Sequence, residues 1–244
     1  MIFSRRLLAT SIAASLALAL GACSETETAE GVPAGEPIAA IPAPDGQAWT
    51  DIVSVTPEGG YLVGNPAAPL KLVEYASHTC GACANFSANG APELKKNYVS
   101  TGVVSVELRN LVRDPLDLTI AALVRCGQPQ NMQPLSDQAW ASLETIFETV
   151  NQNGAALEAA SQLPPNQRFL GIAQAAGLID FFAARGVSSE QAATCLADSA
   201  KIEAIAARSQ QQSTQLEITG TPTFFLNGKK LDVNQWEGLE PILQ

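Results

Sequence analysis

The sequence contains few of the residues with which proteins bind metal ions or nucleic acids. It has one histidine and two methionines, and its 24 aspartates and glutamates outnumber 14 lysines and arginines, which gives a net charge of −10. An acidic chain lacks the positive surface that holds nucleic acid or an anionic membrane. Copper sites favour methionine and histidine, and zinc sites normally need a second ligand pair beside a cysteine pair. We therefore expect no nucleic-acid partner and no metal.

The apolar run near the start of the sequence is too short for a transmembrane helix. Residues 7–20 form a run of about 14 residues, whereas a bilayer-spanning helix needs about 20. The pair Arg5 and Arg6 precedes this run and small residues follow it, which predicts a signal peptide over residues 1–22. The sequence LGAC at its end resembles the lipobox of bacterial lipoproteins and predicts lipidation of Cys23. The alternative is an ordinary cleaved signal beside a chance cysteine.

The segment after the signal has almost nothing large to bury. Residues 23–48 are acidic and rich in proline, alanine and glycine, and such a composition predicts disorder because it cannot offset the entropy of ordering. We expect a tether between a lipid anchor on Cys23 and a folded domain. This places the protein at the periplasmic face of the bacterial cell envelope, or free in the periplasm if Cys23 is not lipidated.

The chain has five cysteines, and an odd number in an exported protein requires an explanation. Lipidation of Cys23 supplies one, because it leaves four cysteines: Cys80, Cys83, Cys126 and Cys195. Four thiols allow three pairings. In an oxidising compartment we expect disulfides rather than free thiols.

Residues 49–113 predict the first half of an α/β domain. A nearly continuous apolar run over 70–76 is typical of a buried central strand. A helix should follow over 81–99, interrupted at Pro92, and a second strand over 103–112. A strand, a helix and a strand in this order indicate a parallel pair with a right-handed crossover.

The remainder of the domain divides into a helical region and a short second half. Residues 114–214 have helical patterning, with Asp114 as an N-cap before a proline. Residues 215–244 regain strand character, and their Asn-Gly pair is a strong hairpin signal. The elements expected there are strands over 223–226 and 229–233 and a closing helix over 234–243.

The sequence Cys80-Gly81-Ala82-Cys83 stands where a buried strand gives way to a helix. Free N–H groups and the helix dipole at that terminus favour an anion, so Cys80 should be a reactive thiolate and the nucleophile. Cys83, one turn inside, is suited to resolve a mixed disulfide. The pair itself is then the redox group, and no other cofactor is expected. An inert disulfide and half of a metal site are the alternatives.

The sequence VEYASHTCGACANF, with GNPAAP before it and GTPTFFLNG far after it, resembles the DsbA-like branch of the thioredoxin superfamily. The resemblance runs from about Trp49 to the last residue. It implies a thioredoxin fold, a central mixed sheet with flanking helices, that carries a large all-helical insertion. It also implies a thiol:disulfide oxidoreductase that exchanges disulfides with envelope proteins, above all by donating them, together with a membrane redox partner. The alternatives are a reductase or isomerase that uses the same pair, and a client-binding assembly factor.

The resemblance also implies roles for individual residues. Pro222 matches a loop proline that is cis in the superfamily and packs against the active-site sulfurs, and Thr221 should pair through its backbone with an extended substrate. Glu74 matches an acid that relays protons to the buried cysteine, and a glutamate that reaches water is the alternative. His78 either stabilises the thiolate or is a solvated loop histidine.

Cys126 and Cys195 match cysteines that form a second disulfide in some DsbA-like proteins, and two unpaired core thiols are the alternative. The residues between the active cysteines depart from the family. Oxidising members carry Pro-His and reducing thioredoxins carry Gly-Pro, whereas this chain has Gly81-Ala82. This dipeptide is one of the determinants of the redox potential, so the sequence leaves the direction of electron flow open.

Overall fold

The structure, a computed structural model, describes residues 38–244. The predicted signal peptide, the lipidation of Cys23 and most of the predicted tether lie outside these residues. The last part of that tether is in contact with the domain, because the Ile41 N–H donates to Thr101 O at 2.8 Å and Trp49 Nε1 donates to Ile41 O at 2.7 Å. The folded domain therefore includes chain before Trp49, where the sequence placed its start.

The centre of the domain is a six-stranded mixed sheet with the order β1-β2-β4-β3-β5-β6. Strands β3 and β4 are parallel, and the other neighbours are antiparallel. The strands are β1 (Val53–Val55), β2 (Tyr61–Gly64), β3 (Leu70–Ala76), β4 (Val104–Asn110), β5 (Thr223–Leu226) and β6 (Lys229–Lys230). Strand β3 lies between β4 and β5, and its second half is buried. The residues that follow Ala76 therefore begin in the interior of the domain.

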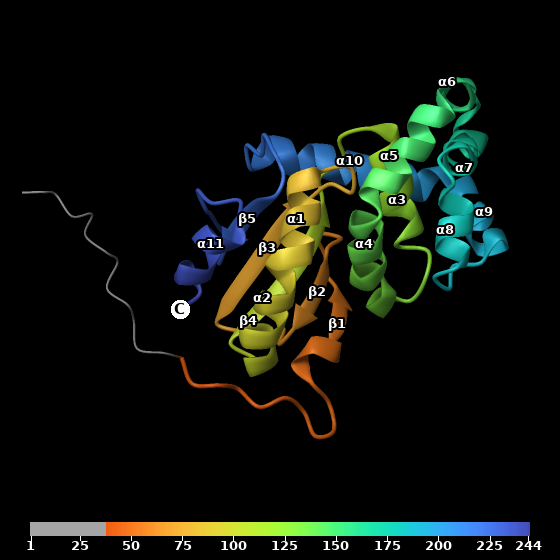
Figure 1. Cartoon of the computed structure of the whole chain (residues 1–244). Coiled ribbons are helices and arrows are strands. Elements are labelled where there is room, and N and C mark those ends of the chain that lie inside the picture. The colour runs from red at the N-terminus through yellow and green to blue at the C-terminus, as the bar shows by residue number, and fades with distance from the viewer. Residues whose placement is uncertain (1–37) are drawn as a thin grey trace, which may run out of the picture. The chain divides into compact units, whose positions relative to one another are not determined.

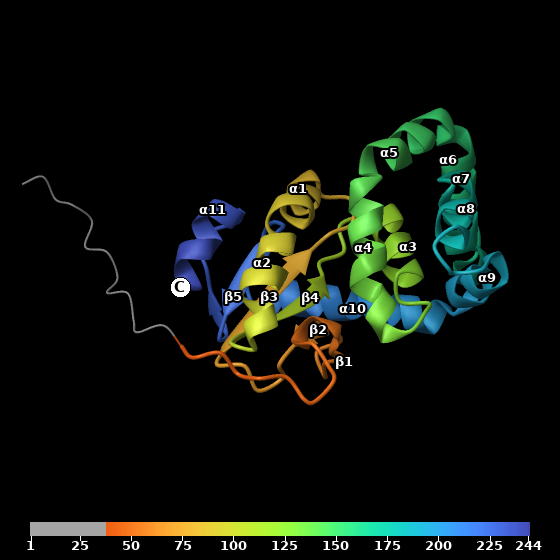
Figure 2. The ribbon, with the colours of Figure 1, turned by 60° about the horizontal axis from the view of Figure 1, so that its bottom comes forward.

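Helices cover both faces of this sheet. Helices α1 (Gly81–Asn89) and α2 (Ala91–Asn97) lie over one face, and α10 (Ser199–Gln215) crosses the other (Figures 1 and 2). On the first face Phe86 of α1 packs edge-on against Phe224 of β5, with ring centroids 4.8 Å apart. On the second face Tyr75, Leu111, Ile218 and Phe225 form a smaller core.

The helical insertion stands beside the sheet (Figure 1). It continues from β4 and returns through α10 to β5. Its elements are α3 (Pro115–Leu123), α4 (Met132–Ala141), α5 (Leu143–Gln152), α6 (Gly154–Ser161), α7 (Pro165–Ala175), α8 (Leu178–Ala183) and α9 (Ser189–Ala197). The predicted α/β architecture, a mixed sheet with flanking helices and a helical insertion, is confirmed. Among residues 38–244 no helix is both long enough and apolar enough to cross a bilayer.

Three elements differ from the sequence expectation, and one is β6, which ends at Lys230 instead of residue 233. The helix expected over 81–99 divides at Gly90 rather than at Pro92, which occupies the first turn of α2. A Cβ at Gly90 would lie 2.7 Å from the Phe86 ring and 2.9 Å from Trp236 Cβ, so the close approach of these two side chains to the backbone requires glycine. The closing helix is short, because α11 (Trp236–Leu239) passes into a 3-10 turn at Pro241, which has no N–H to continue it.

Candidate active site

The first cysteine of the motif caps the helix that follows β3. Cys80 has extended backbone angles, φ −103° and ψ 116°, and is the N-cap of α1. Its sulfur accepts a hydrogen bond from the backbone N–H of Cys83 at 3.4 Å. An N-cap side chain normally satisfies one of the free N–H groups of the first turn, and here a sulfur does so. The cysteine expected to be the nucleophile therefore stands at the positive end of the helix.

The surroundings of Cys80 favour its thiolate. A hydrogen bond from the Cys83 thiol lowers the pKa of Cys80 most, burial opposes this, and the N–H groups of Cys83 and Ala82 lower the pKa further, to about 5. An unperturbed cysteine has a pKa near 8.5. At neutral pH Cys80 is therefore a thiolate, the form that attacks disulfides.

Cys83 has the opposite environment. Its side chain is fully buried, and the sulfur is not in a disulfide. Burial, the hydrogen bond to Cys80 and the charge of Glu74 all raise the pKa of Cys83. Cys83 therefore stays protonated at neutral pH unless a nearby base removes its proton, which is the property required of a resolving thiol.

Glu74 lies on β3 between Leu108 of β4 and Phe224 of β5, and it is 6% exposed. Its Oε1 is buried without a hydrogen-bond partner among the described residues. Burial and the charge of Asp137 raise the pKa of this carboxyl to about 8, although Lys95 lowers it. The alternative of a glutamate that reaches water is therefore wrong, and the carboxyl can both give and accept a proton near neutral pH.

Two charged residues beside Glu74 were not found from the sequence. Lys95 of α2 and Asp137 of α4 form an ion pair at 3.1 Å, and Ser87 of α1 donates to Asp137 at 2.7 Å. All three line a cavity of about 20 Å³ that Glu74 also borders, which is room for about one water molecule. Asp137 is 42 residues from Lys95 along the chain, and no local pattern indicates that the insertion would bring them together.

The loop before β5 reaches the active sulfur. The Thr221–Pro222 peptide bond is cis, and the Cys80 sulfur lies 3.2 Å from the carbonyl oxygen of Thr221, to which it donates a hydrogen bond only when it is protonated. Thr223 then pairs with Tyr75 on β3. A polar hollow of about 520 Å³ borders this loop, lined by residues 219–223 and 230–234. The backbone of Thr221 therefore lies between the nucleophile and an open surface.

His78 is completely buried, so the interpretation as a solvated loop histidine is wrong. Its ring stacks on Trp140 with centroids 5.1 Å apart, and Nε2 lies 2.9 Å from Ser136 Oγ. Its backbone N–H donates to Asp117 at 2.8 Å, and Nδ1 lies 3.4 Å from Asn110 Nδ2. Through these contacts the segment before Cys80 packs against and is hydrogen-bonded to α3 and α4 of the insertion.

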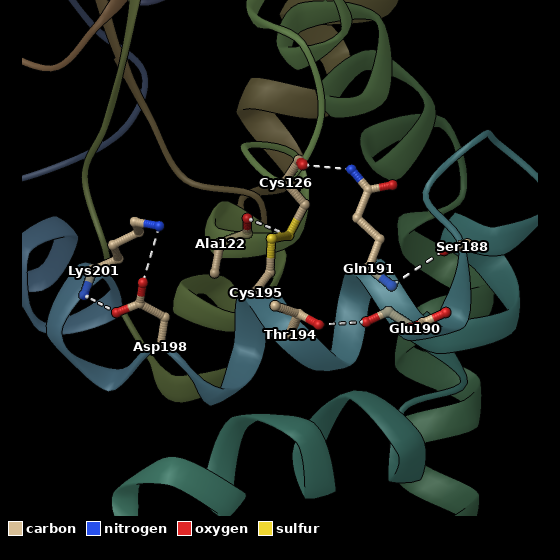
Figure 3. The surroundings of a disulfide bond; sticks show 9 residues. All are labelled: Ala122, Cys126, Ser188, Glu190, Gln191, Thr194, Cys195, Asp198 and Lys201. Atoms are coloured by element: carbon tan, nitrogen blue, oxygen red, sulfur yellow. Dashed lines mark hydrogen bonds and ion pairs between the residues drawn. A yellow bond between two sulfur atoms is a disulfide. The ribbon is translucent and has the colours of Figure 1, made fainter.

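Cys126 and Cys195 form a disulfide, with Cα atoms 5.9 Å apart, and the alternative of two unpaired thiols is wrong. Figure 3 shows this bond joining the turn that follows α3 to α9. The side chain of Gln191 adds a second link between the same segments by donating to Cys126 O at 2.6 Å. The bond is inside the insertion and away from the residues that surround Cys80.

Comparisons with known proteins agree with this arrangement. A family model described as thioredoxin matches residues 56–244. A solved structure of a protein-disulfide isomerase from Novosphingobium aromaticivorans is 32% identical and has a TM-score of 0.70, over 75% of this chain and 94% of that chain. The alpha-DsbA1 of Wolbachia pipientis shares the fold at 21% identity, with a TM-score of 0.60 over 75% of this chain and 88% of that one.

A proposed protein-disulfide oxidoreductase of Rickettsia bellii is 26% identical over 70% of this chain. The match covers 58% of the Rickettsia bellii protein and 53% of a similarly named protein from Rickettsia conorii. The chain thus spans little more than half the length of these curated relatives.

Proposed function

Because the chain belongs to the thioredoxin family, we propose that it is a thiol:disulfide oxidoreductase that donates disulfides to proteins of the cell envelope through Cys80 and Cys83. The observation that carries this proposal is the contrast between the two cysteines. One is a thiolate at a helix N-terminus, with a pKa of about 5, and the other is a buried thiol directly behind it. An inert structural disulfide has no need of such a contrast.

Disulfide donation uses both sulfurs in turn. A client thiolate attacks Cys80 of the Cys80–Cys83 disulfide, which forms a mixed disulfide and releases Cys83. A second client thiolate then attacks the client sulfur of the mixed disulfide, so the client becomes oxidised and Cys80 leaves as a thiolate. Each client thiol loses its proton, and Cys83 gains one. The active pair ends reduced and requires reoxidation by a membrane redox partner.

Glu74 is the proposed source of the proton that Cys83 takes up. With a pKa of about 8, the Glu74 carboxyl is mostly protonated at pH 7 and can neutralise the Cys83 thiolate as it forms. In reoxidation the same carboxylate removes the proton again. The cavity shared by Glu74 and Asp137 has room for a water that could return protons to the surface.

The low pKa of Cys80 supports donation over reduction. Holding the thiolate at a pKa of about 5 stabilises the reduced pair by roughly 3 kcal/mol at pH 7 over an unperturbed thiol, or about 60 mV for a two-electron couple. A pair that is more stable when reduced is a stronger oxidant. The isomerase named among the similar structures suggests the alternative, in which the pair works reduced. The potential of Cys80–Cys83 against glutathione distinguishes the two.

We propose that clients bind as extended chains beside Thr221. The hollow next to this residue is open and polar, and backbone pairing at a strand edge needs few specific side chains. Thr221 O lies 3.2 Å from the Cys80 sulfur. A client strand paired there would hold its own sulfur near the nucleophile.

Trapping of mixed disulfides tests the proposed function. In the Cys83→Ser variant the Cys80 thiolate can still attack a disulfide of an envelope protein, and no Cys83 thiol remains to displace that protein, so mixed disulfides should persist and appear as reductant-sensitive bands on non-reducing gels. This variant tests disulfide exchange at Cys80, and the potential of the pair tests its direction. The double variant Cys80→Ser/Cys83→Ser is the matched control and should show none of these bands. Absence of trapped proteins in the single variant would favour a client-binding assembly factor in which the cysteines contribute little.

A further inference from the structure

A second site lies on another part of the domain. A cavity of about 460 Å³ is bordered by β1, β2, β4, α3, α9 and α10, and its size is within the range of small-molecule pockets. Its lining contains none of the residues placed around the nucleophile: Cys80, Cys83, Glu74 and Thr221. Figure 3 shows part of this region, with Lys201 and Asp198 next to the Cys126–Cys195 disulfide that borders the cavity.

The cavity is basic although the chain is acidic overall. Four cationic and two anionic side chains line it: Arg109, Arg125, Lys201, Arg208, Glu58 and Asp198. Arg109 and Lys201 already have carboxylate partners, since Arg109 lies 2.7 Å from Glu107 and 3.7 Å from Glu58, and Lys201 Nζ lies 3.0 Å from Asp198. The unmatched positive charge therefore belongs to Arg125 and Arg208.

Arg125 is half-buried and forms no ion pair with a carboxylate among residues 38–244. Its guanidinium donates to two neutral acceptors, Asn110 Oδ1 at 2.5 Å and Gly59 O at 3.3 Å, and lies over the Tyr61 ring at 4.9 Å from the centroid. Its Nε–H is buried and has no partner among the described residues. Burial lowers the pKa of Arg125, Tyr61 opposes this, and the charge of Arg208 lowers the pKa further. Burying even part of a charge costs free energy unless an opposite charge or hydrogen bonds offset it.

Arg208 lies against the same turn from the other side. A Cβ at Gly59 would be 1.7 Å from Arg208 Nη1, so this guanidinium packs directly on the glycine. Gly59 also has φ +76°, a conformation that suits glycine. The side chain of Arg208 is exposed, and within residues 38–244 it has no ion pair. Two guanidinium groups without carboxylate partners thus bracket one exposed turn at the cavity.

We propose that this cavity binds a small organic anion, whose carboxylate or phosphate group lies between the guanidinium groups of Arg125 and Arg208. The planar guanidinium fork matches both kinds of oxyanion and forms short charge-assisted hydrogen bonds with them. The rest of the ligand would pack against Tyr61, Ile205 and the Cys126–Cys195 disulfide, which supply an apolar wall. Such a ligand offsets the repulsion between the two arginines.

Direct binding of simple probes tests the site. Calorimetric titrations of the purified chain with benzoate, citrate and inorganic phosphate, at constant ionic strength, compare a carboxylate on an apolar ring, a polycarboxylate and a phosphate. We expect saturable binding of at least one probe. Preference for benzoate would assign the ligand to aromatic or aliphatic carboxylates, and preference for inorganic phosphate would assign it to phosphorylated compounds.

The variant Arg208→Gln should bind the best probe at least tenfold more weakly, because it removes one of the two guanidinium groups at the cavity. Arg208 is exposed, so a neutral side chain there leaves the fold intact. Lys229→Gln is the matched control: this exposed lysine on β6 does not line the cavity, and its loss should change affinity less than twofold. Arg208→Lys should give an intermediate affinity, since it keeps charge but not the fork. The proposal is overturned if no probe binds saturably, or if the Arg208→Gln and Lys229→Gln variants bind the best probe with equal affinity.

Discussion

Replacing Glu74 by glutamine should stabilise the protein and slow its chemistry. The carboxyl has a pKa of 4.5 in its ordinary state and about 8 in the fold, so the folded state binds this proton more tightly than the unfolded state. The contribution of Glu74 to the free energy of unfolding is then most favourable below pH 4.5 and declines as pH rises to 8. At 1.36 kcal/mol for each pH unit, this pKa difference lowers the free energy of unfolding by about 3 kcal/mol at pH 7 and by about 5 kcal/mol above pH 8, relative to its value below pH 4.5.

Glu74→Gln removes this pH-dependent cost. For a domain of this size 1 kcal/mol corresponds to about 2–4 °C, so Tm should rise by up to about 10 °C at pH 7 and by no more than about 3 °C at pH 5. Thermal unfolding of the reduced protein from pH 5 to 9 measures the effect. Glu203→Gln, which neutralises an exposed carboxylate on α10, is the control and should leave Tm almost unchanged.

The same variant should exchange disulfides at least tenfold more slowly near pH 7, because a positioned acid or base typically contributes more than this to proton transfer. Stopped-flow reduction of the oxidised protein by a dithiol gives the rate. If Glu74→Gln and wild type had the same Tm at pH 8 and the same exchange rate at pH 7, the buried carboxyl would have neither the cost nor the relay role assigned to it.

The other predictions concern the remaining cysteines and Asp137. Alkylation of Cys80 in the reduced protein should have its midpoint near pH 5, read by mass spectrometry of the modified peptide, and a midpoint near 8.5 would contradict the assignment of nucleophile. The double variant Cys126→Ala/Cys195→Ala should lower the free energy of unfolding by about 4 kcal/mol, because these cysteines are 69 residues apart, while the alkylation midpoint of Cys80 stays the same. Asp137→Asn should lower the pKa of Glu74, whose carboxyl titration is followed by NMR, because the charge of Asp137 raises that pKa; an unchanged titration would mean that the pair does not interact.

Local patterns predicted the parts of the fold and site that depend on local structure. The strand before Cys80, the helix after it and the alternation that points Glu74 inward are each set within about ten residues, so sequence periodicity identifies them. The two faces of β3 follow from the same alternation. The resemblance extended this to Pro222 and to the Cys126–Cys195 pair, which no local pattern would connect.

The features that the sequence did not predict depend on how the helical insertion packs against the sheet. His78 stands in a short polar segment that reads as solvent-exposed, yet Trp140 and Ser136 of α4 cover it. Asp137 belongs to the same helix and sets the charge beside Glu74. Likewise the polar segment before Trp49 reads as disordered, but a hydrogen bond from that indole fixes Ile41 to the domain.

Disulfide transfer tests the central claim most directly. The oxidised chain is mixed with a reduced, unfolded protein that contains two cysteines, and formation of the client disulfide is followed against time for wild type, Cys80→Ala and Cys126→Ala/Cys195→Ala. We predict rapid transfer by wild type and by the second variant, and none above background by Cys80→Ala. Transfer that survives loss of Cys80, or that disappears with the Cys126–Cys195 bond alone, would contradict the assignment of Cys80 and Cys83 as the redox pair.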